Sequence, residues 1–326
     1  MTVPTTCPAC HQSGGTILST RDGKTGDALV VVQCAHCGLG HVEPMPSVQA
    51  LEQWYASHYR QDYKQAESPR LSHVLRAARL GLERWKWAST RPVFRMPVRS
   101  LDIGASSGEW VYLLQGLGVA ARGIEPHQGY SAFARNALGL DITTGTLQQR
   151  LPDMPAGGFD LVSMFHVLEH LPDPVQSLQA ITRLLSPGGM LFIEVPDVAG
   201  LSSPRNTFFR AHTLYFSAHS LRAVVRAAGL EVVAENFQEG GNLRVLLQVA
   251  RHRAPVTWEP SDALLRGQEA RRWSNYLLRR LIDGHAWRRH MRRLEEKRTA
   301  REHADARSLL DATYRGLVPH QAQVTA

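Results

Sequence analysis

The length, composition and charge of the chain exclude several classes of protein. Its 326 residues are 43% hydrophobic and include seven Trp, which predicts one large folded domain with smaller parts rather than a disordered chain. No apolar stretch approaches the ~20 residues that span a bilayer, and the N-terminus lacks a basic segment followed by an apolar run. We therefore expect a cytoplasmic protein. The net charge of +8 is concentrated in residues 266–307, which contain thirteen basic and six acidic side chains.

All four cysteines lie in the first 40 residues, where Cys7 with Cys10 and Cys34 with Cys37 form two Cys-x-x-Cys pairs. Four thiolates complete the tetrahedral shell of a structural zinc ion and leave no open position for catalysis. A disulfide staple is one alternative, but it suits exported chains. A reduced ribbon without metal is the other. We predict a zinc ribbon over residues 1–45, with a strand over residues 28–32.

Residues 46–95 show helical patterns and are predicted to form a connector or lid. Ser47 is a candidate N-cap for a helix over residues 48–55. A second helix is predicted after Pro69, because apolar residues recur there at a spacing of three to four. They are Leu71, Val74, Leu75, Ala78, Leu82 and Trp85.

From residue 96 to residue 252 strand-like and helix-like segments alternate, which predicts an α/β fold: a parallel sheet with helices on both faces. The candidate strands are residues 98–103, 120–124, 141–143, 159–165, 190–195, 231–236 and 244–250. The candidate helices are residues 109–117, 130–138, 174–185 and 221–228. Residues 253–326 are predicted to form a basic helical tail, with Gly284 as a break.

Two features in the first half of this region indicate a nucleotide-like ligand. Residues 101–108 pass from an apolar strand through small residues into a helix, as Asp-x-Gly-x-x-x-Gly. Small residues allow close approach of a ligand, and a helix N-terminus offers unpaired amides. Glu125 ends the next strand, where a carboxylate accepts hydrogen bonds from ribose hydroxyls. Taken singly, these are also the features of an ordinary strand–turn–helix corner and of a surface acid.

Together with two further blocks, these segments resemble the class I S-adenosylmethionine-dependent methyltransferases. The further blocks are residues 159–174, with the sequence FDLVSMFHVLEHLPDP, and residues 185–189, with the sequence LSPGG. The resemblance covers residues 100–250 and implies a Rossmann-like, seven-stranded sheet. It implies that residues 104–108 pass under the methionyl group, that Glu125 holds the ribose and that Thr146 and Leu147 lie beside the adenine. Asp102, Gly104, Ser106, Gly108 and Phe165 complete the expected cofactor contacts. Ser106 departs from the commonest family pattern, which has Gly there.

The N-terminal pattern resembles the zinc-ribbon methyltransferases, which include deoxysugar C-methyltransferases. It consists of the two cysteine pairs, Pro-x-Pro and a Tyr-rich helix over residues 54–63, and residues 240–244 resemble the glycine-rich entry to the last strand of that group. Those sugar enzymes carry another nucleotide-fold domain after this point, whereas this chain continues as a basic tail. The resemblance therefore supports the reaction class more than the substrate.

Methyl transfer can require a base for the acceptor atom, and histidine has a suitable pKa. The candidates are His166, His170 and His212, with Tyr215 as a further acceptor contact. His166, Glu169 and His170 fall at i, i+3 and i+4, so a helix there could also bind a metal. This spacing resembles the Glu-x-x-Glu-His of ubiquinone-pathway O-methyltransferases, with His166 in place of the first Glu. The alternative for His170 is packing in a turn.

The sequence as a whole predicts methyl transfer from S-adenosylmethionine to a small-molecule or glycan acceptor such as a sugar nucleotide. One alternative is an RNA methyltransferase, suggested by the ribbon and the Arg-rich tail, but no RNA-recognition signature supports nucleic-acid binding. Another is a cofactor-binding regulator or scaffold without turnover. The apolar residues within the tail could pack on the main domain or join two copies into a homo-oligomer.

Overall fold

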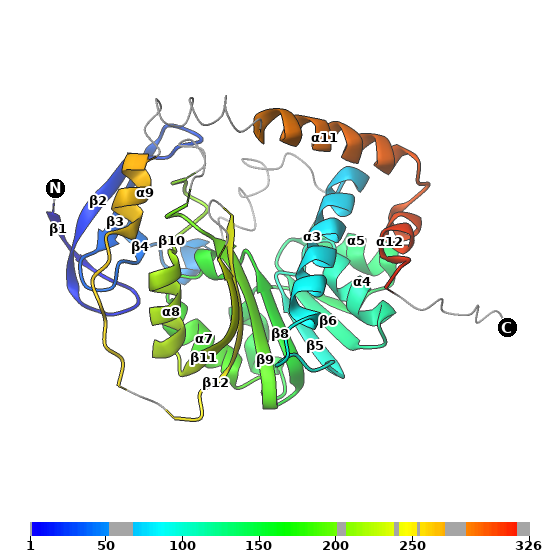
Figure 1. The fold of residues 1–326 in the computed structure, drawn as a ribbon, viewed down its shortest axis with the longest axis horizontal. Helices are drawn as coiled ribbons and strands as arrows, with labels where there is room; N and C mark the ends of the chain where they lie inside the picture. Colours follow the sequence, from blue (N-terminus) through cyan, green and yellow to red (C-terminus); the bar gives the residue numbers. More distant parts are fainter. Residues whose placement is uncertain are drawn as a thin grey trace. The chain divides into compact units, whose positions relative to one another are not determined.

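The computed structural model describes residues 2–51, 68–200, 207–237, 241–252, 255–270 and 285–317 (Figure 1). The chain divides into two units, each assembled from separate stretches of sequence. The first unit comprises residues 1–51, 164–183 and 190–283, and the second comprises residues 52–163, 184–189 and 284–326. None of the helices in the described ranges is both long and apolar enough to cross a membrane.

A seven-stranded sheet has the strand order β11-β12-β9-β8-β5-β6-β7. Its strands are β5 (Arg99–Ile103), β6 (Ala120–Glu125), β7 (Ile142–Thr144), β8 (Phe159–Phe165), β9 (Leu185–Pro196), β11 (Leu230–Phe237) and β12 (Asn242–Val249). Pairs β5–β6 and β6–β7 are parallel, whereas β12 is antiparallel to both β9 and β11. The predicted parallel sheet is therefore confirmed for these two pairs, whereas the last two strands make it a mixed sheet. Only four residues join β11 to β12, and a parallel connection needs a dozen or more.

The N-terminal ribbon is part of a second, five-stranded sheet. Its strands β1 (Thr2–Thr6), β2 (Ser13–Arg21), β3 (Ala28–Cys34) and β4 (Gly40–Glu43) are antiparallel neighbours in chain order. The fifth strand, β10 (Leu214–Tyr215), comes from much later in the chain and pairs antiparallel with β4.

The hydrophobic core under this sheet is shared between the ribbon and later segments. Leu18, Val31 and Val42 of the ribbon form one buried cluster with Val198, Phe208, Tyr215 and Leu264. Helix α9 (Ala263–Ala270) lies beside β2 (Figure 1). The ribbon therefore does not have a core of its own. Too few apolar side chains lie within 45 residues to bury one another, so the ribbon completes its core with other parts of the first unit.

Two more helices of the first unit begin at side-chain caps. The carboxylate of Asp173 accepts a hydrogen bond from Gln176 N at the start of α7 (Pro174–Thr182). Ser217 caps α8 (Ala218–Ala227) in a capping box with Ser220, as its sequence position predicts. Helix α7 ends before the predicted residue 185, because Leu185 already belongs to β9.

The second unit contains α3 (Leu71–Ser89), α4 (Glu109–Gly116), α5 (Gln128–Leu138), α6 (Leu147–Arg150), a 3-10 turn (Leu151–Asp153), α11 (His285–Arg301) and α12 (Ala306–Tyr314). Helix α3 buries the predicted apolar face and packs against α4, α11 and α12. Tyr314 of α12 is buried, and its hydroxyl donates a hydrogen bond to Glu109 O at 3.1 Å.

The described part of the basic tail contains α9, α11 and α12, and its last helix packs into the second unit. On α11, Trp287, Met291 and Leu294 are exposed. The other apolar tail residues singled out from the sequence, Trp273, Tyr276, Leu277 and Leu281, lie outside the described residues, as do Gly284 and the helix predicted over residues 54–63. For the first predicted connector helix, residues 48–51 are helical, and Ser47 Oγ accepts a hydrogen bond from Ala50 N at 3.2 Å.

Candidate functional site

The turn between β5 and α4 adopts an unusual backbone conformation at three positions. Gly104, Ser106 and Gly108 have φ values of 77°, 52° and 89°, in the left-handed region. Glycine adopts this region freely, whereas an L side chain there costs about 1–2 kcal/mol. The amides of Gly104 and Ala105 both donate to Ile124 O at 2.9 Å, which fixes the turn against β6. This conformation explains why a small residue is needed at position 106.

Glu125 joins the end of β6 to the same turn. Its carboxylate is buried and accepts hydrogen bonds from Ser106 N at 2.8 Å and from His127 N at 2.9 Å. The predicted neighbourhood of Glu125, Gly104 and Ser106 is therefore present.

The other cofactor candidates occupy different environments. Asp102 is buried within β5, where Ser163 Oγ donates to it at 2.6 Å, and burial raises its pKa to about 7. Thr146 caps α6 by accepting a hydrogen bond from Gln149 N, and Leu147 is buried. In the first unit, Phe165 packs edge-on against Phe192 with ring centroids 5.0 Å apart.

His166, directly after β8, lies between two carboxylates. Its backbone is left-handed, with φ 58°. Nδ1 is 3.3 Å from Glu169 Oε1, and Nε2 is 3.5 Å from Glu194 Oε1. Burial opposes the charged form, but the two carboxylates outweigh it and raise the pKa of His166 to about 9. His166 is therefore an imidazolium at neutral pH and a poor base.

Glu194 and Arg244 belong to this cluster, although the sequence analysis did not identify them. Glu194 lies in β9 opposite Arg244 of β12, and Arg244 Nε donates to its carboxylate at 2.7 Å. Asn242 donates to the same carboxylate at 3.0 Å. The sequence feature that could have indicated this pair is a single acid within the apolar run of one strand and a single Arg within the apolar run of another. Only the register of the two strands shows that the charges meet.

His212 and His170 lie on the other side of Glu169. His212 Nε2 is 3.9 Å from Glu169 Oε1, and the His212 ring is 4.9 Å from the His170 ring. Burial and the neighbouring His170 hold the pKa of His212 well below its usual range. Burial also lowers the pKa of His170, whose Nδ1 lies 2.6 Å from Ala211 O. Burial therefore favours the neutral imidazole of His212, which is the form that can accept a proton.

The metal-binding trio expected from helical spacing is not the one that the structure brings together. Residues 168–170 form only a short 3-10 helix, so His166 does not share a helical face with His170. Instead Glu169, His170 and His212 each offer a ligand atom within 4.8 Å of the others. His166 contacts this set through Glu169 but is not one of its three members.

Tyr215 does not occupy the position expected of a residue that contacts the acceptor. Its side chain is fully buried in β10 and packs edge-on against Phe208. Its hydroxyl donates to Phe209 O at 3.0 Å and accepts from Phe209 N at 3.2 Å. Because the hydroxyl is buried and hydrogen-bonded to the backbone of Phe209, Tyr215 is a structural residue and not a candidate acceptor contact.

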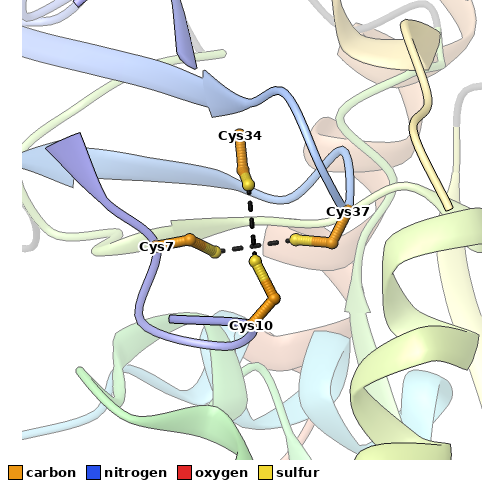
Figure 2. A group of neighbouring side chains, drawn as sticks. All are labelled: Cys7, Cys10, Cys34 and Cys37. Carbon is orange, nitrogen blue, oxygen red and sulfur yellow. Dashed lines mark hydrogen bonds between the residues drawn. The ribbon is translucent and has the colours of Figure 1, made fainter. Parts of the chain in front are cut away.

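The four cysteines converge on one point from two loops of the ribbon (Figure 2). Their sulfur atoms are buried, and Cys7 Sγ to Cys37 Sγ and Cys10 Sγ to Cys34 Sγ are both 3.6 Å. A disulfide bond would require about 2.05 Å. A tetrahedral zinc ion with Zn–S bonds of about 2.3 Å separates its sulfur ligands by about 3.8 Å. The donor set therefore fits zinc, and all four cysteines of the chain are free thiols.

Comparisons with known proteins identify the family of the chain. The family described as "Methyltransferase domain" matches residues 55–235, more than half of the chain. The ubiquinone biosynthesis O-methyltransferase of Pseudomonas aeruginosa (strain LESB58) is 34% identical over 98 residues, which are 28% of this chain and 42% of that protein. The C-methyltransferase NovU of Streptomyces niveus is 25% identical over 227 residues, 67% of this chain and 51% of that protein.

Among solved structures, a SAM-dependent methyltransferase from Thermotoga maritima is 20% identical, with a TM-score of 0.40. The match covers 54% of this chain and 99% of that chain. The chain spans about half or less of the length of the two curated relatives. The family match over residues 55–235 identifies the chain as a member of the class I S-adenosylmethionine-dependent methyltransferases.

Proposed function

We propose that the protein transfers a methyl group from S-adenosylmethionine to a small-molecule or glycan acceptor, with His212 as the base. The observation that carries this proposal is the buried pair of His212 and Glu169, in which the imidazole is held neutral beside a carboxylate. A buried neutral imidazole beside an acid is suited to remove a proton from a hydroxyl, amine or activated carbon.

The cofactor would be held by the turn of residues 104–108 and by Glu125. Bound S-adenosylmethionine supplies an activated methyl group, so orientation of the acceptor and exclusion of water provide much of the remaining rate. The carboxylate of Glu125 would accept hydrogen bonds from the ribose hydroxyls while its existing bond to Ser106 N keeps the turn in place. Thr146, Leu147 and Phe165 remain predicted contacts of the adenine and methionyl groups.

Glu169 connects the two histidines and gives them different roles. Burial raises the pKa of Glu169, but the hydrogen bond with His166 and the electrostatic effects of His170, His166 and His212 together lower it to about 2, so this carboxylate stays ionised. It can then orient the imidazole of His212 and stabilise the imidazolium that forms when His212 takes a proton. His166, already charged, balances Glu169 and Glu194 rather than exchanging protons itself.

A small acceptor is favoured by the relatives, one named as an O-methyltransferase of ubiquinone biosynthesis and one as a C-methyltransferase. The cytoplasmic location and the association of copies through the C-terminal helices stay predictions. The exposed residues Trp287, Met291 and Leu294 of α11 are the side chains that such an association would use.

We propose further that Cys7, Cys10, Cys34 and Cys37 hold one structural zinc ion. The buried donor set and its sulfur spacing support this. Elemental analysis should find about one zinc per chain. A zinc content near zero together with four reactive thiols in the native protein would contradict it.

The catalytic proposal is tested by His212→Ala and by the matched variant His290→Ala, which truncates an exposed histidine of α11. Methyl transfer from labelled S-adenosylmethionine is measured on a metabolite extract and on total RNA. His212→Ala should lower transfer to the extract by roughly 100-fold or more, because the base is lost. Cofactor affinity from calorimetry should not change, and His290→Ala should behave as wild type.

Two results would overturn this assignment. Unchanged transfer by His212→Ala would remove His212 from the chemistry. Labelling of RNA alone, with activity that falls steeply as salt increases, would favour the RNA methyltransferase.

A further inference from the structure

The loop that carries His212 contacts the ribbon at several points. Residues 207–213 contain no helix or strand of their own. At the end of the loop, β10 adds to the ribbon sheet, with Leu214 opposite His41 and Tyr215 opposite Gly40. Val42 N also donates to Thr213 O at 3.0 Å. The residue directly after His212 is thus hydrogen-bonded to the ribbon.

Asp22, in the turn of residues 22–27 between β2 and β3, joins the ribbon to the middle of this loop. Its side chain is 2% exposed. Oδ1 accepts from Lys24 N at 2.7 Å, and Oδ2 accepts from Arg210 N at 2.7 Å. Gly23 N donates to Phe208 O at 2.7 Å. One buried carboxylate therefore fixes both its own turn and the backbone two residues before His212.

A row of side chains continues from the same turn to the imidazole. The Lys24 ammonium lies 3.5 Å from the centroid of the Phe209 ring. The Phe209 ring in turn lies 4.1 Å from the His212 ring, and His212 N donates to Phe209 O at 3.0 Å. Phe209 is itself held by the hydroxyl of Tyr215. The position of His212 thus depends on Phe209, and the position of Phe209 depends on the ribbon.

We propose that the ribbon turn of residues 22–27 is a positioning element for His212, with Asp22 as its main positioning residue. The inference rests on the proposed function, in which His212 acts on the acceptor. The β2–β3 hairpin links the cysteine site to this turn. Cys10 and Cys34 flank the hairpin at one end, and the turn of residues 22–27 forms its other end. The cysteine site would keep the hairpin straight, and the hairpin would hold the catalytic loop.

The test compares Asp22→Asn with Asp27→Asn. Asp27 lies in the same turn with an exposed side chain, so the control removes the same charge from the same place. Asp22→Asn places an amide NH₂ against one backbone N–H donor. Hydrogen exchange of peptides covering residues 207–216 should become at least ~10-fold faster in Asp22→Asn and stay unchanged in Asp27→Asn. Zinc content, and calorimetric stoichiometry and affinity for S-adenosylmethionine, should stay at wild-type values in both.

Methyl transfer to the metabolite extract, expressed per bound cofactor, should fall about tenfold in Asp22→Asn while KM for S-adenosylmethionine is kept. Unchanged exchange over residues 207–216 would overturn the positioning role. Faster exchange in Asp22→Asn, combined with unchanged methyl transfer by His212→Ala, would instead refute the assignment of His212 as the base. The structural coupling between the turn and the loop would then still hold.

Lys24→Met provides a second variant if Asp22→Asn does not fold. It keeps an apolar stem over Phe209 but removes the cation. Hydrogen exchange of peptides covering residues 207–216 should also become faster in Lys24→Met, because the cation over the Phe209 ring is lost. Unchanged exchange in this variant would show that the turn does not hold the loop of His212.

Discussion

Replacing Gly108 by Ala should destabilise the protein more than the same change at Gly118, although both glycines flank α4 and both are left-handed. Their φ values are 89° and 84°. A Cβ at position 108 would lie 2.4 Å from Leu140 Cδ1 and 3.0 Å from Ile142 Cδ1, whereas a Cβ at position 118 has nothing within 4 Å. The two variants therefore share the backbone strain and differ in the steric clash.

The magnitudes follow from these two terms. Left-handed backbone at Ala costs about 1–2 kcal/mol, and the lower entropy of the unfolded chain offsets about 0.4–1 kcal/mol of it. Gly118→Ala should thus lose about 0.5–1.5 kcal/mol. Gly108→Ala adds overpacking of a buried site, about 1–3 kcal/mol, because Leu140 and Ile142 are themselves buried.

Urea unfolding of wild type and both variants, compared at equal m-values, measures the difference. Calorimetry should also show weaker binding of S-adenosylmethionine by Gly108→Ala, since the displaced residue ends the turn of residues 104–108, and unchanged binding by Gly118→Ala. Equal stability losses at the two positions would refute the steric reasoning and mean that Leu140 and Ile142 move aside freely.

Three further outcomes are expected. Ser106→Gly should raise the free energy of unfolding by up to about 1 kcal/mol, because relief of left-handed strain exceeds the entropy that glycine adds to the unfolded chain. A matched Ser106→Ala variant, which keeps the strain, should show no gain in free energy by urea unfolding. His166 has a folded pKa of about 9, above its ordinary value of 6.5, so its stabilisation is complete below pH 6.5 and is lost as pH rises through 9. His166→Gln should therefore flatten the decline of unfolding free energy over this interval, and an unchanged slope in titrated urea midpoints would disprove the pairing with two carboxylates. Tyr314→Phe should cost about 0.5–1.5 kcal/mol through its buried hydroxyl, whereas Tyr112→Phe, whose hydroxyl bonds an exposed carboxylate, should cost less; the reverse order in urea unfolding would contradict the packing of α12.

The parts of the fold that local sequence signals determine were predictable. The turn of residues 104–108, the acid at the end of β6 and the cap at Ser47 were predicted because each depends on neighbours in the chain. The register of distant strands was not predictable in this way. The pairing of β4 with β10, which rests on only two residues of β10, and the meeting of Glu194 with Arg244 are therefore findings of the structure.

Aromatic and ionisable side chains were harder to interpret than backbone signals. A Tyr beside a candidate His can face a ligand or the core, and only three-dimensional packing decides that Tyr215 is buried. The three histidines were equivalent candidates because the sequence does not show which of them has two carboxylate neighbours. The geometry around Glu169 and Glu194 distinguishes them.

The late arrival of β10 has a consequence for synthesis of the chain. The four ribbon strands are complete at Glu43, but their fifth strand begins at Leu214, about 170 residues later. At translation rates of about 5–20 residues per second, the outer edge of β4 waits roughly 10–30 s for its partner. An unpaired strand edge is a template for pairing with another chain. Nascent chains and fragments that stop before residue 214 should therefore be the species most prone to associate with one another.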